Sequence, residues 1–142
     1  MDFVFWKSVA TTAVFALALG NVLTILQVMG KHQLLPLSPM ALSRWHRVQG
    51  DAALVIFFGV AYYCLTEATV DPHSRRVFAH VVLGWLTLLL VAAKVAGSRW
   101  LPRLGRLLNP LGAALFLATA GTFATSALWY WLAEIWGIDI GY

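Results

Sequence analysis

Long apolar stretches, separated by short charged ones, dominate the pattern of residues along the chain. Four of these stretches are long enough for a membrane-crossing helix, which takes about 20 residues to span a ~30 Å hydrocarbon core. They are too long and too continuous to be strands of a membrane barrel. The pattern therefore predicts an all-α membrane protein, a bundle of four transmembrane helices over residues of about 7–29, 45–66, 75–97 and 109–134.

The amino-acid composition agrees with this pattern. Of the 142 residues, 61% are hydrophobic and 11% are charged, whereas soluble domains have roughly half and a quarter. Four spans leave almost no room for a soluble domain, so we expect residues 1–142 to form a single transmembrane domain. Hydrolytic chemistry is not indicated, because the sequence has no Gly-x-Ser-x-Gly, P-loop or His-Glu-x-x-His motif.

Basic residues gather at one end of the predicted bundle. By the positive-inside rule, that end faces the cytoplasm and both termini lie outside, in the periplasm or extracellular space. The net charge of +4 is therefore interpreted as a signal of topology, and a role in nucleic-acid binding has little support. The seven basic residues of the inner end are Lys31, Arg44, Arg47, Lys94, Arg99, Arg103 and Arg106.

Two ionisable side chains fall within the third span, where hydrocarbon makes them costly. Lys94 is close to the inner end, and its long side chain can reach interfacial water. His80 is about one turn below the outer surface, on the same helical face as Gly84, Thr87 and Val91. This face is expected to point into the bundle. An imidazole there has little structural use, so His80 is the first candidate for a functional residue.

A pattern shared by two histidines points to haem. In His46-xxx-Gly50 and His80-xxx-Gly84, a glycine one turn from the histidine leaves a flat space that a porphyrin can occupy. His80 and His46 are therefore the candidate iron ligands, one near each leaflet. At a rise of 1.5 Å per residue they lie about 25 Å apart in depth, so they cannot hold the same iron.

Charged residues near these histidines are candidate partners of the haem propionates. Arginine pairs well with carboxylate groups, which makes Arg75 and Arg76 candidates at the outer site. Arg44, Arg47 and Lys94 could act in the same way at the inner site. A role as ordinary flanking charges is an equally good interpretation of all five residues.

Three segments carry a resemblance to known proteins: RWHRVQGDAALVIFFGVAYYCL, RVFAHVVLGWLTLLLVAAKV and TSALWYW. Over residues 45–131 the chain resembles a bacterial family of four-span membrane proteins, a domain of unknown function. It is more distantly similar to small haem-b membrane cytochromes of the ferric-reductase-like and dihaem types. That likeness implies haem b, quinone and the bacterial inner membrane. Such sequences have a histidine where this chain has Tyr63, so an outer haem would need Tyr63, water or another subunit as its sixth ligand.

The leading functional hypothesis is a small integral-membrane electron-transfer protein or cytochrome-b-like subunit. It would pass electrons between a quinol in the bilayer and another membrane or periplasmic redox subunit at the outer face. One alternative is a non-redox accessory subunit that anchors a larger membrane complex. Another is a proton or small-solute carrier with Asp51, His46 and Lys94 as a relay, although a salt bridge to Arg47 at i+4 explains Asp51 more simply.

Overall fold

The computed structural model describes residues 3–31, 35–66 and 74–137. Within these ranges the chain is helical apart from short turns: α1 (Phe3–Val28), α2 (Pro39–Thr66), α3 (Arg75–Arg99), the 3-10 helix η1 (Pro102–Leu107), α4 (Leu108–Thr125) and α5 (Ala127–Trp136). Four helical stretches are long and apolar enough to cross a membrane: Val4–Val28, Pro39–Thr66, Arg75–Arg99 and Gly105–Trp136. The prediction of an all-α protein with four membrane-spanning segments is confirmed.

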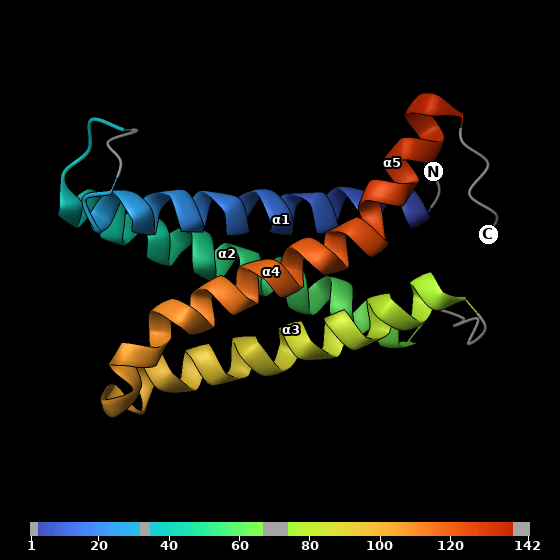
Figure 1. The fold of residues 1–142 in the computed structure, drawn as a ribbon. Helices are drawn as coiled ribbons and strands as arrows, with labels where there is room; N and C mark the ends of the chain where they lie inside the picture. Colours follow the sequence, from blue (N-terminus) through green and yellow to red (C-terminus); the bar gives the residue numbers. More distant parts are fainter. Residues whose placement is uncertain (1–2, 32–34, 67–73, 138–142) are drawn as a thin grey trace.

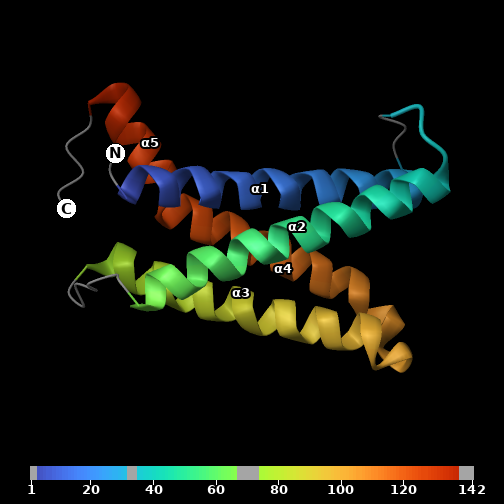
Figure 2. The same cartoon turned by 180° about the vertical axis from the view of Figure 1, so that it is seen from behind.

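The helices form two antiparallel pairs, α1 with α2 and α3 with α4 (Figure 1). The pairs are joined mainly through α1, which packs against α4 and α5. At this seam Phe15 of α1 stacks on Phe123 of α4, with ring centroids 4.6 Å apart and planes 7° from parallel. In contrast, the described parts of α2 and α3 make little direct contact. They approach each other where α2 ends and α3 begins, and they diverge from there (Figure 2).

Glycine allows the helices of each pair to approach closely. A Cβ atom on Gly20 of α1 would lie 3.0 Å from Nε2 of Gln49 on α2. A Cβ atom on Gly121 of α4 would lie 2.9 Å from a methyl group of Leu83 on α3. Helices in a bilayer associate largely through such close packing, because lipid tails are as apolar as the side chains that would be buried.

The second span begins earlier than the sequence pattern predicts, at Pro39 and not near residue 45. Proline suits a first helical position because it has no N–H group to leave without a partner. The hydroxyl oxygen of Ser38 accepts from the N–H of Ala41 at 3.3 Å and caps the helix there. Residues 39–44 therefore belong to the same helix as the span, which is 28 residues long.

The fourth predicted span, residues 109–134, is not one continuous helix. It breaks at Ser126, where φ is −129° and ψ is −86°, and α5 continues in a different direction (Figure 1). The hydroxyl groups of Thr122, Thr125 and Ser126 all donate to backbone carbonyls one turn earlier. Such bonds compete with the helical hydrogen bonds and bend helices, which accounts for a break without proline.

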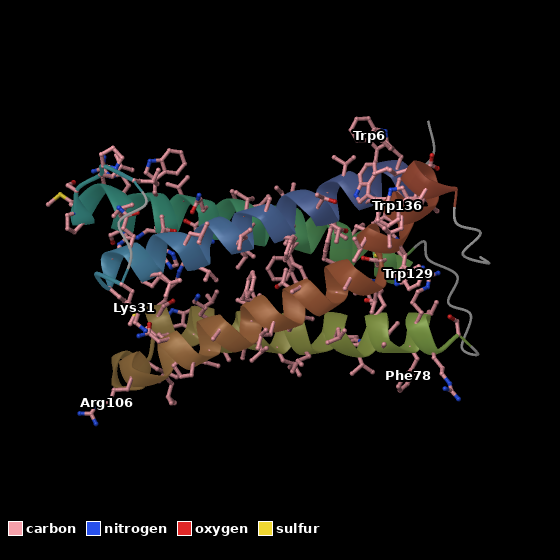
Figure 3. All side chains as sticks on the ribbon, turned by 45° about the horizontal axis from the view of Figure 1, so that its top comes forward. Trp6, Lys31, Phe78, Arg106, Trp129 and Trp136 are labelled. Carbon is pink, nitrogen blue, oxygen red and sulfur yellow. The ribbon has the colours of Figure 1, made fainter. Side chains whose placement is uncertain are left out.

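The helix α5 leans over the beginning of α1. The indole N–H of Trp131 donates to the hydroxyl of Thr12 at 2.9 Å, and the Trp131 ring meets Phe5 edge-on at 6.1 Å. The first and last described residues consequently lie at the same end of the molecule (Figure 1). The labelled tryptophans, Trp6, Trp129 and Trp136, are at this end, and Lys31 and Arg106 are at the opposite end (Figure 3).

Candidate functional site

A cavity of about 240 Å³ lies between the helix pairs, in the half of the molecule near residues 3 and 137. We call it the His80 cavity. Its lining comes from α1, α2, α3 and α4. Leu65 of α2 and Trp85 of α3 line it and are also 67% and 53% exposed on the surface. The cavity therefore reaches the surface between α2 and α3, the side that faces lipid in a membrane.

Most polar groups of the lining are already satisfied within their own helices. Thr11, Thr87, Thr119, Thr122 and Ser126 each donate their hydroxyl to a carbonyl one turn earlier. The polar groups that remain are the ammonium of Lys7, the thiol of Cys64, the imidazole of His80 and the indole N–H of Trp85. The cavity thus combines mainly apolar walls with a small number of reactive or charged groups, which is typical of small-molecule sites.

His80 stands on the buried face of α3, as predicted. Farther along this face, Thr87 and Val91 are only 1% and 8% exposed. The Nδ1 atom of His80 lies 3.3 Å from the hydroxyl oxygen of Thr125 on α4. Gly84, one turn away, also lines the cavity, and a Cβ atom there would meet nothing within 4 Å. The predicted open space beside the imidazole of His80 is therefore present.

Three other residues predicted for the outer site lie elsewhere. Tyr63, Arg75 and Arg76 are not among the lining residues. The guanidinium of Arg76 lies over the ring of Trp129, 5.9 Å from its centroid, in a cation–π contact. Each residue turns a helix by about 100°, so the neighbour of Tyr63 takes its place in the lining. That neighbour is Cys64.

Lys7 and Cys64 are lining residues that the sequence analysis did not single out. The depth of Lys7 was available from the sequence, because it is one turn before Thr11, which lines the same cavity. The rotation of α1 about its axis was not available, because the polar residues of α1 are spread around its circumference and do not mark one face.

His46 lies outside the cavity, against α1. Its Nδ1 atom is 3.2 Å from the backbone carbonyl of Asn21. In the amide orientation that satisfies both ends of Asn21, its nitrogen also donates to the carbonyl of His46 at 2.7 Å and its oxygen accepts from the N–H of Gly50 at 3.2 Å. The space beside Gly50 is thus filled by α1: a Cβ atom there would lie 3.8 Å from the side-chain amide of Asn21. These residues serve the packing of α1 on α2.

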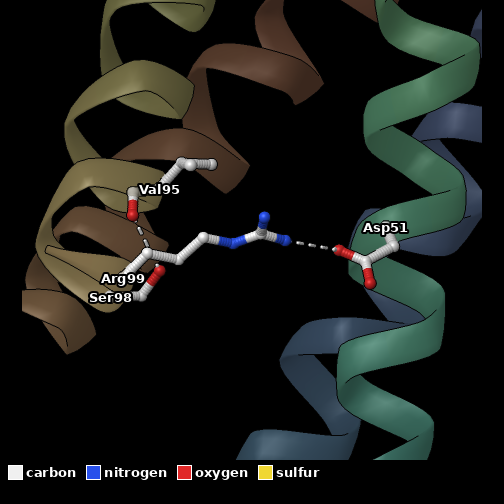
Figure 4. A network of polar contacts seen from close by, with 4 residues as sticks. All are labelled: Asp51, Val95, Ser98 and Arg99. Carbon is white, nitrogen blue, oxygen red and sulfur yellow. Dashed lines mark hydrogen bonds and ion pairs between the residues drawn. The ribbon is translucent and has the colours of Figure 1, made fainter.

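The charged side chains of the inner end also make contacts between helices. Asp51 of α2 pairs with Arg99 of α3, with 3.7 Å between Nη2 and Oδ1 (Figure 4). The expected pairing of Asp51 with Arg47 is therefore wrong. Lys94 lies against α4, since a Cβ atom on Gly112 would be 3.1 Å from its Nζ. Asp51 and Lys94 line no part of the His80 cavity.

Haem b does not fit the His80 cavity as it stands. Sites for drug-sized molecules have volumes of about 300–1,000 Å³, and the cavity of about 240 Å³ is small even for these, let alone for a four-ring porphyrin. The arginines expected to bind propionates are outside it, and so is Tyr63.

The fold and the cavity define a small integral membrane protein with four spans and a laterally placed apolar site. The chain belongs to the family of unknown function DUF6529, whose model matches residues 2–136. This confirms the resemblance to a membrane family of unknown function, over more of the chain than residues 45–131. Comparison with curated proteins and with solved structures finds no match. The more distant likeness to haem-b cytochromes stays a prediction.

Proposed function

We propose that this chain is a small electron-transfer subunit of a bacterial inner membrane and that it binds a quinone or quinol in the His80 cavity. One observation carries the proposal. The cavity opens between α2 and α3 and brings Lys7 and His80 together within mainly apolar walls. A quinone is a flat ring with two polar oxygen atoms and a long apolar tail, so its parts match the parts of this cavity.

The ring and the tail have separate places in the proposed complex. The ring lies in the open space beside Gly84, in a cavity that the aromatic residues Phe57 and Trp85 also line. The tail leaves past Leu65, which is largely exposed between α2 and α3. A cavity of about 240 Å³ suits a single ring, with the tail remaining in the lipid.

The oxygen atoms of the ring meet Lys7 and His80. The ammonium of Lys7 has three donors and no acceptor, whereas a neutral imidazole has one donor and one acceptor. In surroundings of low polarity, each hydrogen bond to a ring oxygen adds orientation as well as affinity. Reduction or oxidation of the quinone would be completed by another membrane or periplasmic redox subunit, reached from the end that carries the cavity.

The first test is ligand binding to the purified protein in detergent. Titration with a short-tailed ubiquinone or menaquinone, followed by calorimetry, is expected to show saturable binding. His80→Ala is expected to lower the affinity about tenfold or more, because it leaves a polar ligand atom without its partner. His46→Ala is the matched control, since this histidine lies outside the cavity, and its affinity is expected to stay within about twofold of the unmodified protein.

Two further results would change the proposal. An absorption spectrum with a haem band that shifts on reduction and is lost in His80→Ala would favour the haem-b cytochrome over the quinone site. A colourless protein of full helical content that binds no quinone in either redox state would overturn the proposal. The non-redox accessory subunit would then be the better interpretation.

We further propose that the His80 cavity lies toward the outside and that both termini are periplasmic. The basic end of the molecule, which carries Lys31 and Arg106, is the opposite end (Figure 3), and basic loops stay in the cytoplasm. Alkaline phosphatase fused to the C-terminus is therefore expected to be active in a bacterial host, at a level at least about tenfold above the same fusion placed after Gly105. The reverse order would place the cavity toward the cytoplasm, and equal activities would contradict a membrane crossing between the two fusion points.

A further inference from the structure

The hydrogen bond between His80 and Thr125 fixes which nitrogen of the imidazole carries the proton. The hydroxyl of Thr125 has a single hydrogen atom. It lies 2.9 Å from the carbonyl of Gly121 and 3.2 Å from that of Thr122, and both of these groups can only accept. Nδ1 of His80, at 3.3 Å, is farther from the Thr125 oxygen than either carbonyl. The hydroxyl hydrogen therefore goes to the α4 backbone.

The oxygen of Thr125 is consequently left as an acceptor toward His80. Nδ1 must then carry the imidazole hydrogen and donate it to Thr125, because an unprotonated Nδ1 would face a lone pair. The backbone carbonyl of Thr122 also faces His80 from α4 and is a further acceptor. The α4 side of the imidazole thus meets acceptors, and this favours the Nδ1–H form of the neutral ring.

The second nitrogen, Nε2, points away from Nδ1 across the five-membered ring. Since the neutral imidazole has only one N–H, Nε2 is a hydrogen-bond acceptor. In the described part of the chain, every fully buried side-chain nitrogen or oxygen has a hydrogen-bond partner. The hydrogen bond of the His80 side chain is made by Nδ1. Nε2 is therefore not fully buried, and open space lies next to it. That space is the His80 cavity, which His80 lines. The cavity therefore presents Nε2 of His80 as an acceptor and the ammonium of Lys7 as a donor, and Cys64 and Trp85 also line it.

We propose that Thr125 is a positioning residue that makes the His80 cavity selective for the hydroxyl-bearing, reduced form of its ligand. A quinol hydroxyl donates to Nε2, whereas a quinone carbonyl would face it lone pair to lone pair. Lys7 donates to the opposite oxygen in both forms. This inference rests on the proposed function for the identity of the ligand, but the state of the imidazole is a property of the protein alone.

The state of His80 can be measured without any ligand. Nitrogen NMR of protein carrying 15N-labelled histidine, with His80→Ala to assign the signals, distinguishes a protonated Nδ1 from a protonated Nε2. The unmodified protein and Thr125→Ser, which keeps the hydroxyl, are expected to show the Nδ1–H form. Thr125→Val removes the acceptor and is expected to give a mixture of the two forms or the Nε2–H form. Predominance of the Nε2–H form in the unmodified protein would overturn the inference.

The selectivity is measured with one short-tailed ubiquinone, titrated anaerobically in its oxidised and its dithionite-reduced form. The quinol is expected to bind about tenfold more tightly than the quinone, the worth of one hydrogen bond in such a site. Thr125→Val is expected to bring the two affinities within about twofold, and Thr125→Ser to restore the difference. Thr24→Val is the matched control, because the hydroxyl of Thr24 also donates to a carbonyl of its own helix but lies next to Gln49 of α2 and not next to His80.

The outcomes separate the inference from the proposed function. Equal affinities for the two redox forms, or tighter binding of the quinone, would overturn the selectivity and leave the quinone site in place. Binding of neither form would overturn the proposed function and the selectivity with it. The NMR spectrum would still decide the role of Thr125 in setting the form of His80.

Discussion

Replacement of Gly84 with phenylalanine is expected to weaken quinone or quinol binding by about 10- to 100-fold, which corresponds to about 1.4–2.7 kcal/mol. A side chain at this position would take the space in which the ring is proposed to lie. It should not disturb the helix packing, because a Cβ atom on Gly84 meets nothing within 4 Å. The measurement is the calorimetric titration used for His80→Ala.

Gly59→Phe provides the control for this variant. Gly59 is also a helical glycine whose Cβ atom would meet nothing within 4 Å, but it is on α2 and does not line the cavity. Both variants add the same side chain to a helix interior, so any general effect on the fold should be equal. Undiminished binding by Gly84→Phe would show that the ring does not use this space.

Replacement of Leu42 with alanine is expected to lower the free energy of unfolding by about 2–3 kcal/mol, toward the lower end of the range for buried leucines. Leu42 is the largest apolar side chain in the described structure that is almost fully enclosed, with 2% of its surface exposed. In a membrane protein the loss comes mainly from missing van der Waals contacts, because little apolar surface is transferred from water.

The measurement is unfolding in mixed micelles with increasing SDS, followed by circular dichroism. Leu89→Ala is the matched control, because Leu89 of α3 is 64% exposed and its loss should change the free energy of unfolding by no more than about 0.5 kcal/mol. Equal effects of the two substitutions would mean that the enclosure of Leu42 contributes nothing to stability.

The spans could be predicted from the sequence because hydrocarbon imposes one simple requirement, a long apolar helix. The details that differ depend on local hydrogen bonds. Because Ser38 caps the helix, α2 begins at Pro39 and not near residue 45 as predicted. The break at Ser126 arises where three hydroxyls donate to carbonyls of the same helix. Threonine and serine are common within spans, so their presence alone does not reveal a bend.

The candidate site could be predicted for only one helix. The face of α3 with His80 and Gly84 was found because an imidazole in hydrocarbon is unusual and sets the rotation of its helix. The other helices offered no such marker. Tyr63 was therefore expected where Cys64 lies, and Lys7 was not expected at all. His46 and Gly50 have the same spacing as His80 and Gly84, but they pack against α1. Asn21 of α1 fills the space beside Gly50.

The slight contact between α2 and α3 gives the His80 cavity an entrance within the bilayer. A ligand that enters there never has to cross an aqueous phase, so its effective concentration is its mole fraction among the lipids. Apparent affinities should then scale with the amount of detergent or lipid in the sample, even when the total ligand and protein are unchanged. For the proposed quinone ligand, the size of the membrane quinone pool would then set the occupancy of the site in a cell.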